Sequence, residues 1–216
     1  MAITVWGRHN SCNVQKVIWA LGELGLDYEH VPLGGSFGGL NDPAYLALNP
    51  NGRVPTLRDG DLVIWESHAI VRYLAATYGA GSLWPTDPQE RAASDQWTDW
   101  TATTFQAAWL RVFELWVRTP IERRQPERIA AARAAADRLY RMMDDRLASR
   151  NFLGGEQPSY ADIVAGVSLF RWMTMDIERT PMRHVEAWYG RLEARPAFRQ
   201  GVCVSYADMV GMPPPA

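Results

Sequence analysis

The sequence predicts an α/β domain at the N-terminus followed by an all-helical domain. Up to residue 78, short apolar runs of strand length alternate with segments whose apolar residues recur at helical spacing. Residues 79–88 are rich in Gly and Pro and are predicted to form a linker. Beyond this linker the apolar pattern becomes helical. We therefore expect one domain at residues 1–78 and a second at residues 89–216.

The N-terminal elements are expected in the order strand, helix, strand, helix, strand, strand, helix. The expected strands are residues 3–6, 28–31, 56–58 and 62–65, and the expected helices are residues 14–24, 43–48 and 67–78. Asp59-Gly60 is a two-residue hairpin signal between the last two strands, and Ser67 is the expected N-cap of the last helix. The strand–helix–strand start and this order are typical of a thioredoxin-like domain.

The second domain is expected to contain two long helices and several shorter ones. The long periodic segments are residues 90–116 and 126–147, and shorter helices are expected after Ser159 and at residues 184–194 and 196–201. Ser159 and Asp162 have the spacing of a capping box, which predicts a stable start to the third of these helices.

Composition excludes several classes of protein. Apolar residues make up 47% of the 216 residues and charged residues 21%, which is typical of a globular protein. The net charge of −2 gives no reason to expect nucleic acid or an anionic membrane as a partner. Two cysteines, Cys12 and Cys203, without metal-ligand spacing predict neither a metal site nor a disulfide framework. No signal peptide or bilayer-spanning run is recognisable, so we expect a cytoplasmic protein.

Two features between Asn49 and Leu74 carry chemistry. A cis Val54-Pro55 bond would turn the Val54 backbone outward, where its N–H and C=O could pair with an extended peptide. Ser67 at a helix start can bind a carboxylate, and the adjacent Glu66 can bind an amine. Each feature also has an ordinary structural interpretation, as a turn proline and as a capped helix.

The motifs NGRVPTL, DG and ESHAIVRYL resemble the glutathione-binding half of cytosolic glutathione S-transferases, and the resemblance extends over essentially the whole chain. It implies that Val54-Pro55 is cis and pairs with the cysteinyl backbone of glutathione, and that Glu66 and Ser67 hold the γ-glutamyl end. It further implies that Arg53 reaches the glycyl carboxylate. Glutathione would be the co-substrate, no metal would be needed, and the protein would be a homodimer.

Ser11 is the candidate catalytic residue. It lies where the first strand leads into a helix, so its hydroxyl could donate a hydrogen bond to a thiolate, or it could simply cap the helix. The segment SCNVQKV resembles the serine-type catalytic turn of the theta, delta and zeta branches, in which this serine activates the glutathione sulfur. Cys12 or Asn13 could face the sulfur instead, and a catalytic Cys12 would resemble the cysteine-type branches that act as thiol transferases or reductases.

The second substrate is expected to be a small apolar electrophile bound between the domains. Trp100 and Thr104, one turn apart on the first long helix, are the candidate residues of its pocket, although aromatic residues on a helix more often form core. The predicted reaction is glutathione transfer to this electrophile. The alternatives are glutathione-dependent disulfide reduction, dehalogenation or isomerisation, and a non-catalytic module that serves assembly.

Overall fold

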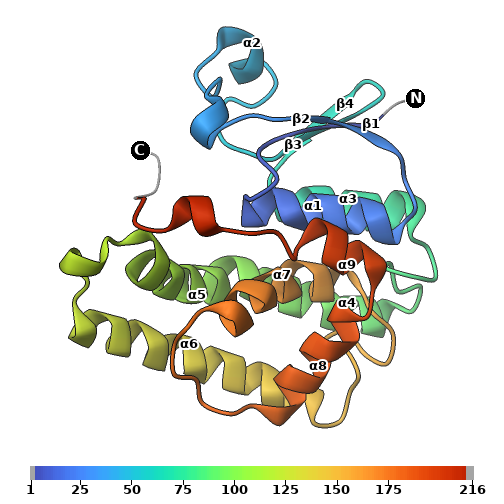
Figure 1. The fold of residues 1–216 in the computed structure, drawn as a ribbon. Coiled ribbons are helices and arrows are strands. Elements are labelled where there is room, and N and C mark those ends of the chain that lie inside the picture. Colours follow the sequence, from blue (N-terminus) through green and yellow to red (C-terminus); the bar gives the residue numbers. More distant parts are fainter. Residues whose placement is uncertain (1–2, 213–216) are drawn as a thin grey trace.

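A computed structural model describes residues 3–212 and contains the predicted α/β and all-helical parts (Figure 1). Four strands form one mixed sheet in the order β2-β1-β3-β4. Their bounds are Ile3–Trp6 (β1), Tyr28–Val31 (β2), Thr56–Asp59 (β3) and Leu62–Trp65 (β4). Strand β1 runs parallel to β2 and antiparallel to β3, because a helix crosses over between the first two strands. The thioredoxin-like arrangement expected from the sequence is confirmed.

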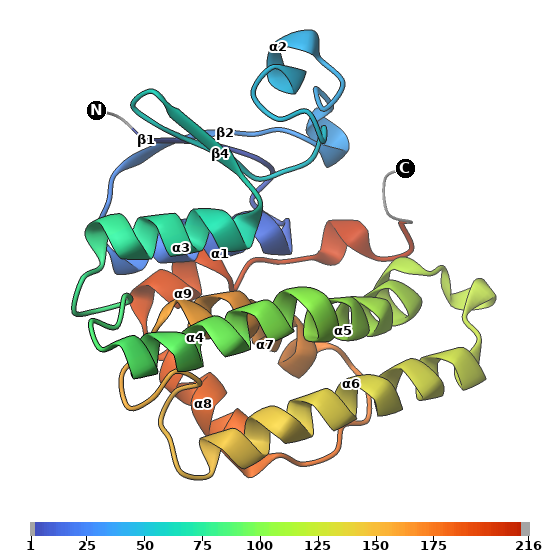
Figure 2. The same ribbon diagram turned by 180° about the vertical axis from the view of Figure 1, so that it is seen from behind.

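Two helices lie between the sheet and the helical part, α1 (Cys12–Glu23) and α3 (Ser67–Tyr78), as the two opposite views show (Figures 1 and 2). Helix α1 is apolar on nearly every side and most of its residues are buried. Such a helix must be covered on both faces. The sheet covers one face and the helical part covers the other. The 3₁₀ turn Gly35–Phe37 (η1) and the short helix α2 (Pro43–Leu46) extend from the sheet beyond this layer.

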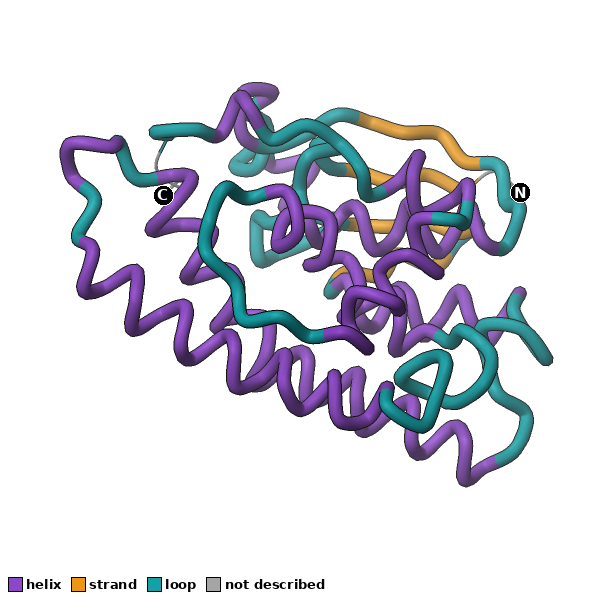
Figure 3. Tube along the Cα trace, turned by 60° about the horizontal axis from the view of Figure 1, so that its bottom comes forward, coloured by secondary structure: helices purple, strands orange, loops and turns teal. Residues whose placement is uncertain are grey.

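The helical part is built on one long helix that contains two π-helical segments. Its successive pieces are α4 (Pro88–Trp100), η2 (Thr101–Phe105), α5 (Gln106–Phe113) and η3 (Glu114–Arg118). The remaining elements are η4 (Ile121–Arg123), α6 (Pro126–Leu147), α7 (Tyr160–Thr174), α8 (Arg183–Glu193), α9 (Pro196–Gly201) and η5 (Ala207–Met209). Figure 3 shows the strands gathered at one side of the molecule and helices elsewhere. None of the helices among residues 3–212 combines the length and apolar character that a bilayer crossing needs.

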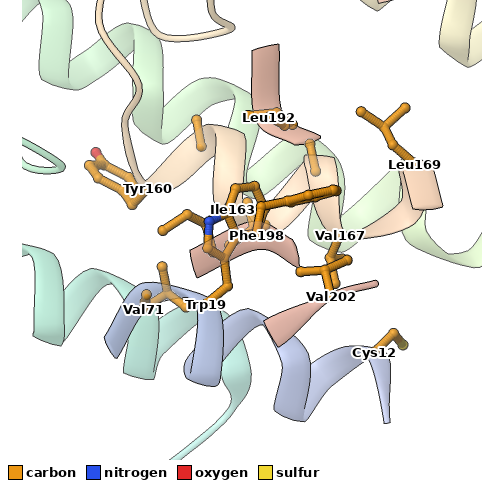
Figure 4. Close-up of a cluster of buried hydrophobic side chains, with 14 of the residues drawn as sticks. Cys12, Trp19, Val71, Tyr160, Ile163, Val167, Leu169, Leu192, Phe198 and Val202 are labelled. Carbon is orange, nitrogen blue, oxygen red and sulfur yellow. The ribbon is translucent and has the colours of Figure 1, made fainter. Parts of the chain in front are cut away.

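The contact between the two parts centres on Trp19 of α1 (Figure 4). Its ring is fully buried and meets Phe198 of α9 edge to face, with ring centroids 4.8 Å apart. Gly166 of α7 allows this approach, because a Cβ there would lie only 3.2 Å from the Trp19 ring. An ion pair of 2.6 Å between Arg195 and Glu23 lies at the same contact. The helical part is thereby fixed against α1.

A second set of contacts joins α3 to α4. The Arg72 guanidinium donates through Nε to Asp95 at 2.9 Å, and it also bonds to the Asp99 carboxylate. These groups are partly exposed, so their contribution to the free energy of folding is small, and their value lies in fixing the orientation of two helices.

Two details differ from the sequence-based predictions. Asp59 pairs with Leu62, so the hairpin loop is Gly60-Asp61, one residue later than predicted. Gly60 has φ +59, which a glycine adopts at no steric cost, and this conformation sets the position of the turn. Ser67 is not an N-cap. The N-cap position of α3 belongs to Glu66, whose φ of +71 is unusual for a residue with a Cβ.

The capping box at the start of α7 is confirmed, and it has a wider role than capping. The Ser159 hydroxyl accepts from the Ala161 N–H, and the Asp162 carboxylate accepts from the Ser159 N–H at 2.9 Å. The same carboxylate accepts from the Leu153 N–H at 2.8 Å and from the Trp188 indole at 3.2 Å. Asp162 is completely buried, so it connects the loop before α7 to α8 through the core.

Asp162→Ala should therefore lower the free energy of unfolding by about 3 kcal/mol, because it leaves two backbone N–H groups and one indole N–H buried without an acceptor. Urea unfolding followed by tryptophan fluorescence would measure this loss. Asp145→Ala, which truncates an exposed acid on α6, serves as the control and should change little. Equal losses in the two variants would contradict the role given to Asp162.

Candidate functional site

A cleft of about 500 Å³ opens beside the N-terminus of α1. It is lined by residues from the loop after β1, the start of α1, the loop before α2 and the turn before β3. These residues are Arg8, Ser11, Asn13, Leu40, Asn41, Leu46, Pro50, Asn51, Gly52, Arg53 and Val54. Polar groups dominate this lining, and the first-turn N–H groups of α1 point toward an anion placed here. The cleft therefore suits an extended, charged ligand.

Ser11 occupies the N-cap position of α1, but its side chain makes no capping hydrogen bond. Its backbone has extended dihedral angles, φ −81 and ψ 124, and its carbonyl accepts from the Gln15 N–H at 2.9 Å. The backbone carbonyl of Ser11 thus accepts the first hydrogen bond of the helix, and the hydroxyl makes no bond to the helix. This arrangement differs from an ordinary serine cap, in which the hydroxyl is consumed by the helix.

Cys12 and Asn13 point to different surroundings. Cys12 is buried, belongs to the hydrophobic core, and is absent from the lining of the cleft. Figure 4 shows it at the edge of the apolar contact between the two parts. Asn13 does line the cleft, and its Oδ1 accepts from the Lys16 ammonium at 3.0 Å. The structure thus places Ser11 and Asn13 at the cleft and Cys12 behind them.

The turn before β3 places the Val54 backbone in the cleft wall. The Val54-Pro55 peptide bond is cis, as expected, and Pro55 is buried. The carbonyl of the preceding Arg53 accepts from the Tyr45 hydroxyl at 2.6 Å and from the Asn49 amide at 2.7 Å, which fixes the turn. Within residues 3–212, the N–H and C=O of Val54 make no backbone hydrogen bond. They are therefore available to a ligand, and the Arg53 side chain is exposed beside them.

Glu66 and Ser67 lie at the start of α3, next to the cleft rather than in its lining. Glu66 is exposed, and its positive φ turns the chain sharply from β4 into the helix. Ser67 is buried, and its hydroxyl lies 3.5 Å from the Lys16 Nζ. Lys16 therefore contacts both Asn13 on the cleft and Ser67 at the start of α3.

Lys16, the only lysine of the chain, is the residue that the sequence analysis missed. It has no exposed surface, and besides the Ser67 hydroxyl its ammonium has three closer acceptors: Asn13 Oδ1, His68 Nε2 at 2.8 Å, and Gln106 Oε1. Three N–H donors thus meet three acceptors, with no carboxylate among them. Its signal in the sequence was a lysine in the middle of a helix that is otherwise apolar on nearly all sides.

Burial shifts the titration of both charged partners in this cluster. It lowers the pKa of Lys16 to about 8. Burial, with the nearby charges of Lys16 and Arg72, lowers the pKa of His68 to about 3. His68 is therefore neutral near pH 7 and accepts from the ammonium, while Lys16 remains mostly protonated. The cluster places a positive charge behind the cleft, and among residues 3–212 no carboxylate is hydrogen-bonded to it.

Gln106 connects this cluster to the helical part. It is the first residue of α5, and besides Lys16 it contacts the Asn13 amide oxygen at 3.4 Å. Sequence reasoning did not select it, because a lone glutamine on a long helix carries no distinguishing pattern.

Trp100 and Thr104, the predicted residues of the electrophile pocket, lie outside the cleft beside Ser11. The Trp100 ring stacks on Phe105 with centroids 5.3 Å apart, and Phe105 in turn meets Tyr140 of α6. Trp100 thus packs onto the core of the helical part. Thr104 is exposed and bonds only to its neighbour Thr103 in the described part of the chain. Neither residue is in the cleft lining.

A second cavity, of about 260 Å³, adjoins the cleft and shares Arg8 with it. Its walls come from the loop after β1, from η1, from the end of η3 and from the segment around η5. Among residues 3–212, no group of three or more His, Cys, Asp or Glu side chains is placed to hold a metal ion.

Comparison with known proteins places the chain among relatives of similar length. Residues 1–76 match the N-terminal domain of glutathione S-transferase, and residues 126–191 match the C-terminal domain of the same family. The chain is 41% identical over 204 residues to glutathione S-transferase GstB of Escherichia coli, covering 94% of this chain and 98% of that protein. It is 34% identical to glutathione S-transferase 3 of Zea mays, covering 99% and 96%.

Among solved structures, the fold matches a theta class glutathione S-transferase from Xanthomonas axonopodis pv. citri with glutathione bound. The TM-score is 0.91 and the identity 48%, over 94% of this chain and 98% of that one. The fold is thus that of a thioredoxin-like domain joined to a helical domain. The chain belongs to the glutathione S-transferase family.

The buried ammonium should make stability depend on pH. Because the pKa of Lys16 is lowered in the folded state, the unfolded chain binds more protons between about pH 8 and 10, and stability rises with pH there. From pH 8 to 9.5 the wild-type free energy of unfolding should increase by about 1.5 kcal/mol relative to Lys16→Met. Urea unfolding of both proteins across this range is the measurement, and parallel pH profiles would contradict it.

Proposed function

We propose that this protein is a glutathione transferase that activates the thiol of glutathione for attack on a small electrophile. The observation that carries this proposal is the Ser11 hydroxyl, which lies at the N-terminus of α1, in a polar cleft, without a capping bond to its own helix. The full-length similarity to glutathione S-transferases supports it, as does the glutathione-bound state of the Xanthomonas relative.

Glutathione would lie across the cleft from the turn at Val54 toward the start of α3. The Val54 N–H and C=O would pair with the cysteinyl backbone, next to Pro55, and the exposed Arg53 would reach the glycyl carboxylate. Glu66 and Ser67 would hold the γ-glutamyl amine and carboxylate at the N-terminus of α3. The Lys16 ammonium beside Ser67 favours the same carboxylate.

In the proposed reaction the bound thiol loses its proton to solvent and remains as a thiolate. The Ser11 hydroxyl donates a hydrogen bond to the sulfur, and the first-turn N–H groups of α1 add favourable electrostatic potential. The thiolate then attacks an electrophilic carbon. A carbon–sulfur bond forms, and the leaving group departs with its electron pair. The domains that perform these tasks would be those expected at residues 1–78 and 89–216, joined by the linker at 79–88.

The alternative chemistries are not equally supported. A disulfide reductase of the cysteine type needs an accessible thiolate, and Cys12 is buried in the core. Asn13 lines the cleft, and because its oxygen accepts from Lys16, its amide N–H is the group that could donate to the sulfur in place of the Ser11 hydroxyl. Dehalogenation and isomerisation begin with the same activated thiol and differ only in the second substrate. A non-catalytic module would not require a Ser11 hydroxyl that is free of a capping bond.

The second substrate would enter the cavity that adjoins the cleft at Arg8. The sequence predicted an apolar electrophile, and Met209 and Met212 supply apolar surface in this cavity. Methionine side chains adapt to ligands of varied shape. The electrophile pocket is therefore proposed here, in place of the predicted pocket at Trp100 and Thr104.

We also propose a cytoplasmic homodimer. Both cysteines are free, which accords with a reducing compartment. The edge strand β4 exposes 42% of Leu62 and 39% of Trp65, and an exposed apolar edge of a sheet favours association.

Ser11→Ala should raise the pKa of the bound glutathione thiol by about one to two pH units, because one hydrogen bond to the anion is lost. Turnover near pH 6.5 should fall about tenfold or more, with glutathione affinity nearly retained. Ultraviolet thiolate absorbance titrated against pH would measure the first effect. Ser149→Ala, an exposed serine after α6, is the control. A thiol titration identical to the wild type would remove Ser11 from the mechanism.

Sedimentation velocity at micromolar concentration should give about twice the chain mass of 24.4 kDa. Trp65→Glu should shift the protein toward the monomer, since it places a charge in the proposed contact. Met142→Glu, on the exposed face of α6, provides a matched control. A monomeric wild type would disprove the homodimer.

A further inference from the structure

Asn13 lies on the same cleft as Ser11 and adds a second polar side chain to its wall. Ser11 is the N-cap of α1 and Asn13 is the second residue of that helix, and both line the cleft, whereas Cys12 between them does not. Asn13 is partly exposed there. A side-chain amide has an oxygen that only accepts and a nitrogen that only donates hydrogen bonds. The end that faces the cleft therefore decides what Asn13 can bind.

Lys16 determines which end of this amide faces the cleft. An ammonium group has three N–H donors and no acceptor, so the Asn13 atom that it meets at 3.0 Å must be the oxygen Oδ1. Lys16 lies one turn further along the same helix and has no exposed surface. A buried ammonium cannot exchange this acceptor for water without cost, so the amide is held in one orientation.

Gln106 of α5 holds the same oxygen from the helical part. Its Oε1 accepts from Lys16, which leaves its own Nε2 to donate to Asn13 Oδ1 at 3.4 Å. Two donors therefore converge on the oxygen of Asn13. Among residues 3–212 the Asn13 amide nitrogen donates no hydrogen bond, so its N–H groups are available to a ligand in the cleft.

The buried ammonium also makes the Asn13 amide a stronger donor. Its charge lies on the oxygen side of the amide, and it polarises the N–H groups on the other side. Burial lowers the pKa of Lys16 to about 8, so the ammonium is mostly charged near pH 7. The exposed Glu66 and the buried Cys12 are the acidic groups that act on Lys16, and its contact His68 is neutral at this pH.

We propose that the Asn13 amide is a second hydrogen-bond donor to the glutathione sulfur, together with the Ser11 hydroxyl. Lys16 and Gln106 are positioning residues, which hold this amide with its N–H groups toward the sulfur. This inference rests on the proposed function and deepens it. The thiol gives its proton to solvent, and no bond to these side chains forms or breaks. Donors that are fixed before the charge develops stabilise it without a cost of reorganisation.

Thiolate absorbance of the glutathione complex, titrated against pH, tests the donor. Asn13→Ala should raise the pKa of the bound thiol by about one pH unit, because one hydrogen bond to the anion is lost. Turnover near pH 6.5 should fall about tenfold for the same reason. Arg8 and Arg53, the charged side chains of the cleft lining, are unchanged in this variant. A thiol pKa equal to that of the wild type would overturn the inference.

The coupling between Asn13 and Lys16 tests the positioning. Lys16→Met releases the amide, which can then turn its oxygen toward the sulfur, so a further Asn13→Ala change should alter the thiol pKa little. If Lys16 had a merely structural role, the full effect of Asn13→Ala would persist in this background, and that result would contradict the positioning.

Two further variants complete this test. Gln106→Met should also reduce the effect of Asn13→Ala, and it keeps the test valid if Lys16→Met does not fold. Gln15→Met is the matched control, because it replaces a buried amide of α1 that has no hydrogen-bonding partner among residues 3–212. It should leave both the thiol pKa and the effect of Asn13→Ala at their wild-type values.

Nuclear magnetic resonance of the unaltered protein gives an independent measurement. The side-chain amide signals of Asn13 are assigned by their loss in Asn13→Ala. One of the two protons should move downfield when glutathione binds as the thiolate. S-methylglutathione, whose sulfur is uncharged, should cause a much smaller change. Equal shifts with the two ligands would show that Asn13 does not donate to the sulfur anion.

The outcomes separate this inference from the proposed function. If glutathione does not bind, or binds with the thiol pKa of free glutathione, the proposed function fails and this inference fails with it. If the thiol pKa is lowered in the wild type and Asn13→Ala does not change it, only this inference fails. If Asn13→Ala raises the thiol pKa equally with and without Lys16, the sulfur contact stands and the positioning by Lys16 is wrong.

Discussion

The structure depends on one buried charge, the Lys16 ammonium between the two domains. An ammonium removed from water without a carboxylate partner is tolerated only where every N–H group has an acceptor. Asn13, His68 and Gln106 supply these acceptors from α1, α3 and α5. The three helices must therefore approach the same point. In this way the requirement to solvate one side chain sets the distance between the cleft and the helical domain.

The cleft and the adjoining cavity differ in the groups that line them. The cleft presents backbone groups and helix starts, which suit a peptide whose shape is constant. The adjoining cavity presents long side chains from the loop after β1, η3 and the segment around η5, which can vary without disturbing the sheet. Arg8 is common to both cavities. It lies in the short loop after β1, so the position of the sheet would also fix where the second substrate meets the first.

Much of the fold could be predicted from the sequence because it follows from local periodicity. The strands and helices of the first domain lie within a residue or two of their expected bounds, and the capping box at Ser159 is where its spacing indicated. The site was predictable only where a local motif encodes it, as at Ser11 and Val54. Lys16 and Gln106 were missed, because their roles arise from a contact between segments that are far apart in the sequence. The electrophile pocket at Trp100 and Thr104 stays a prediction, because a helical stripe of aromatic residues does not by itself distinguish a pocket from core.

The π-helical segment Thr101–Phe105 lies directly before Gln106 in the long helix. A π turn holds one more residue than an α turn, so every side chain after it is rotated by about 100° relative to an uninterrupted α-helix. The segment behaves as a one-residue insertion that the helix has absorbed without breaking. A descendant that lost any single residue here would keep its helix and its hydrophobic content, yet Gln106 would face away from Lys16. The contact between Gln106 and Lys16 therefore depends on the number of residues in this segment as well as on their identity. A comparison of sequences that considers substitutions alone does not detect a change in that number.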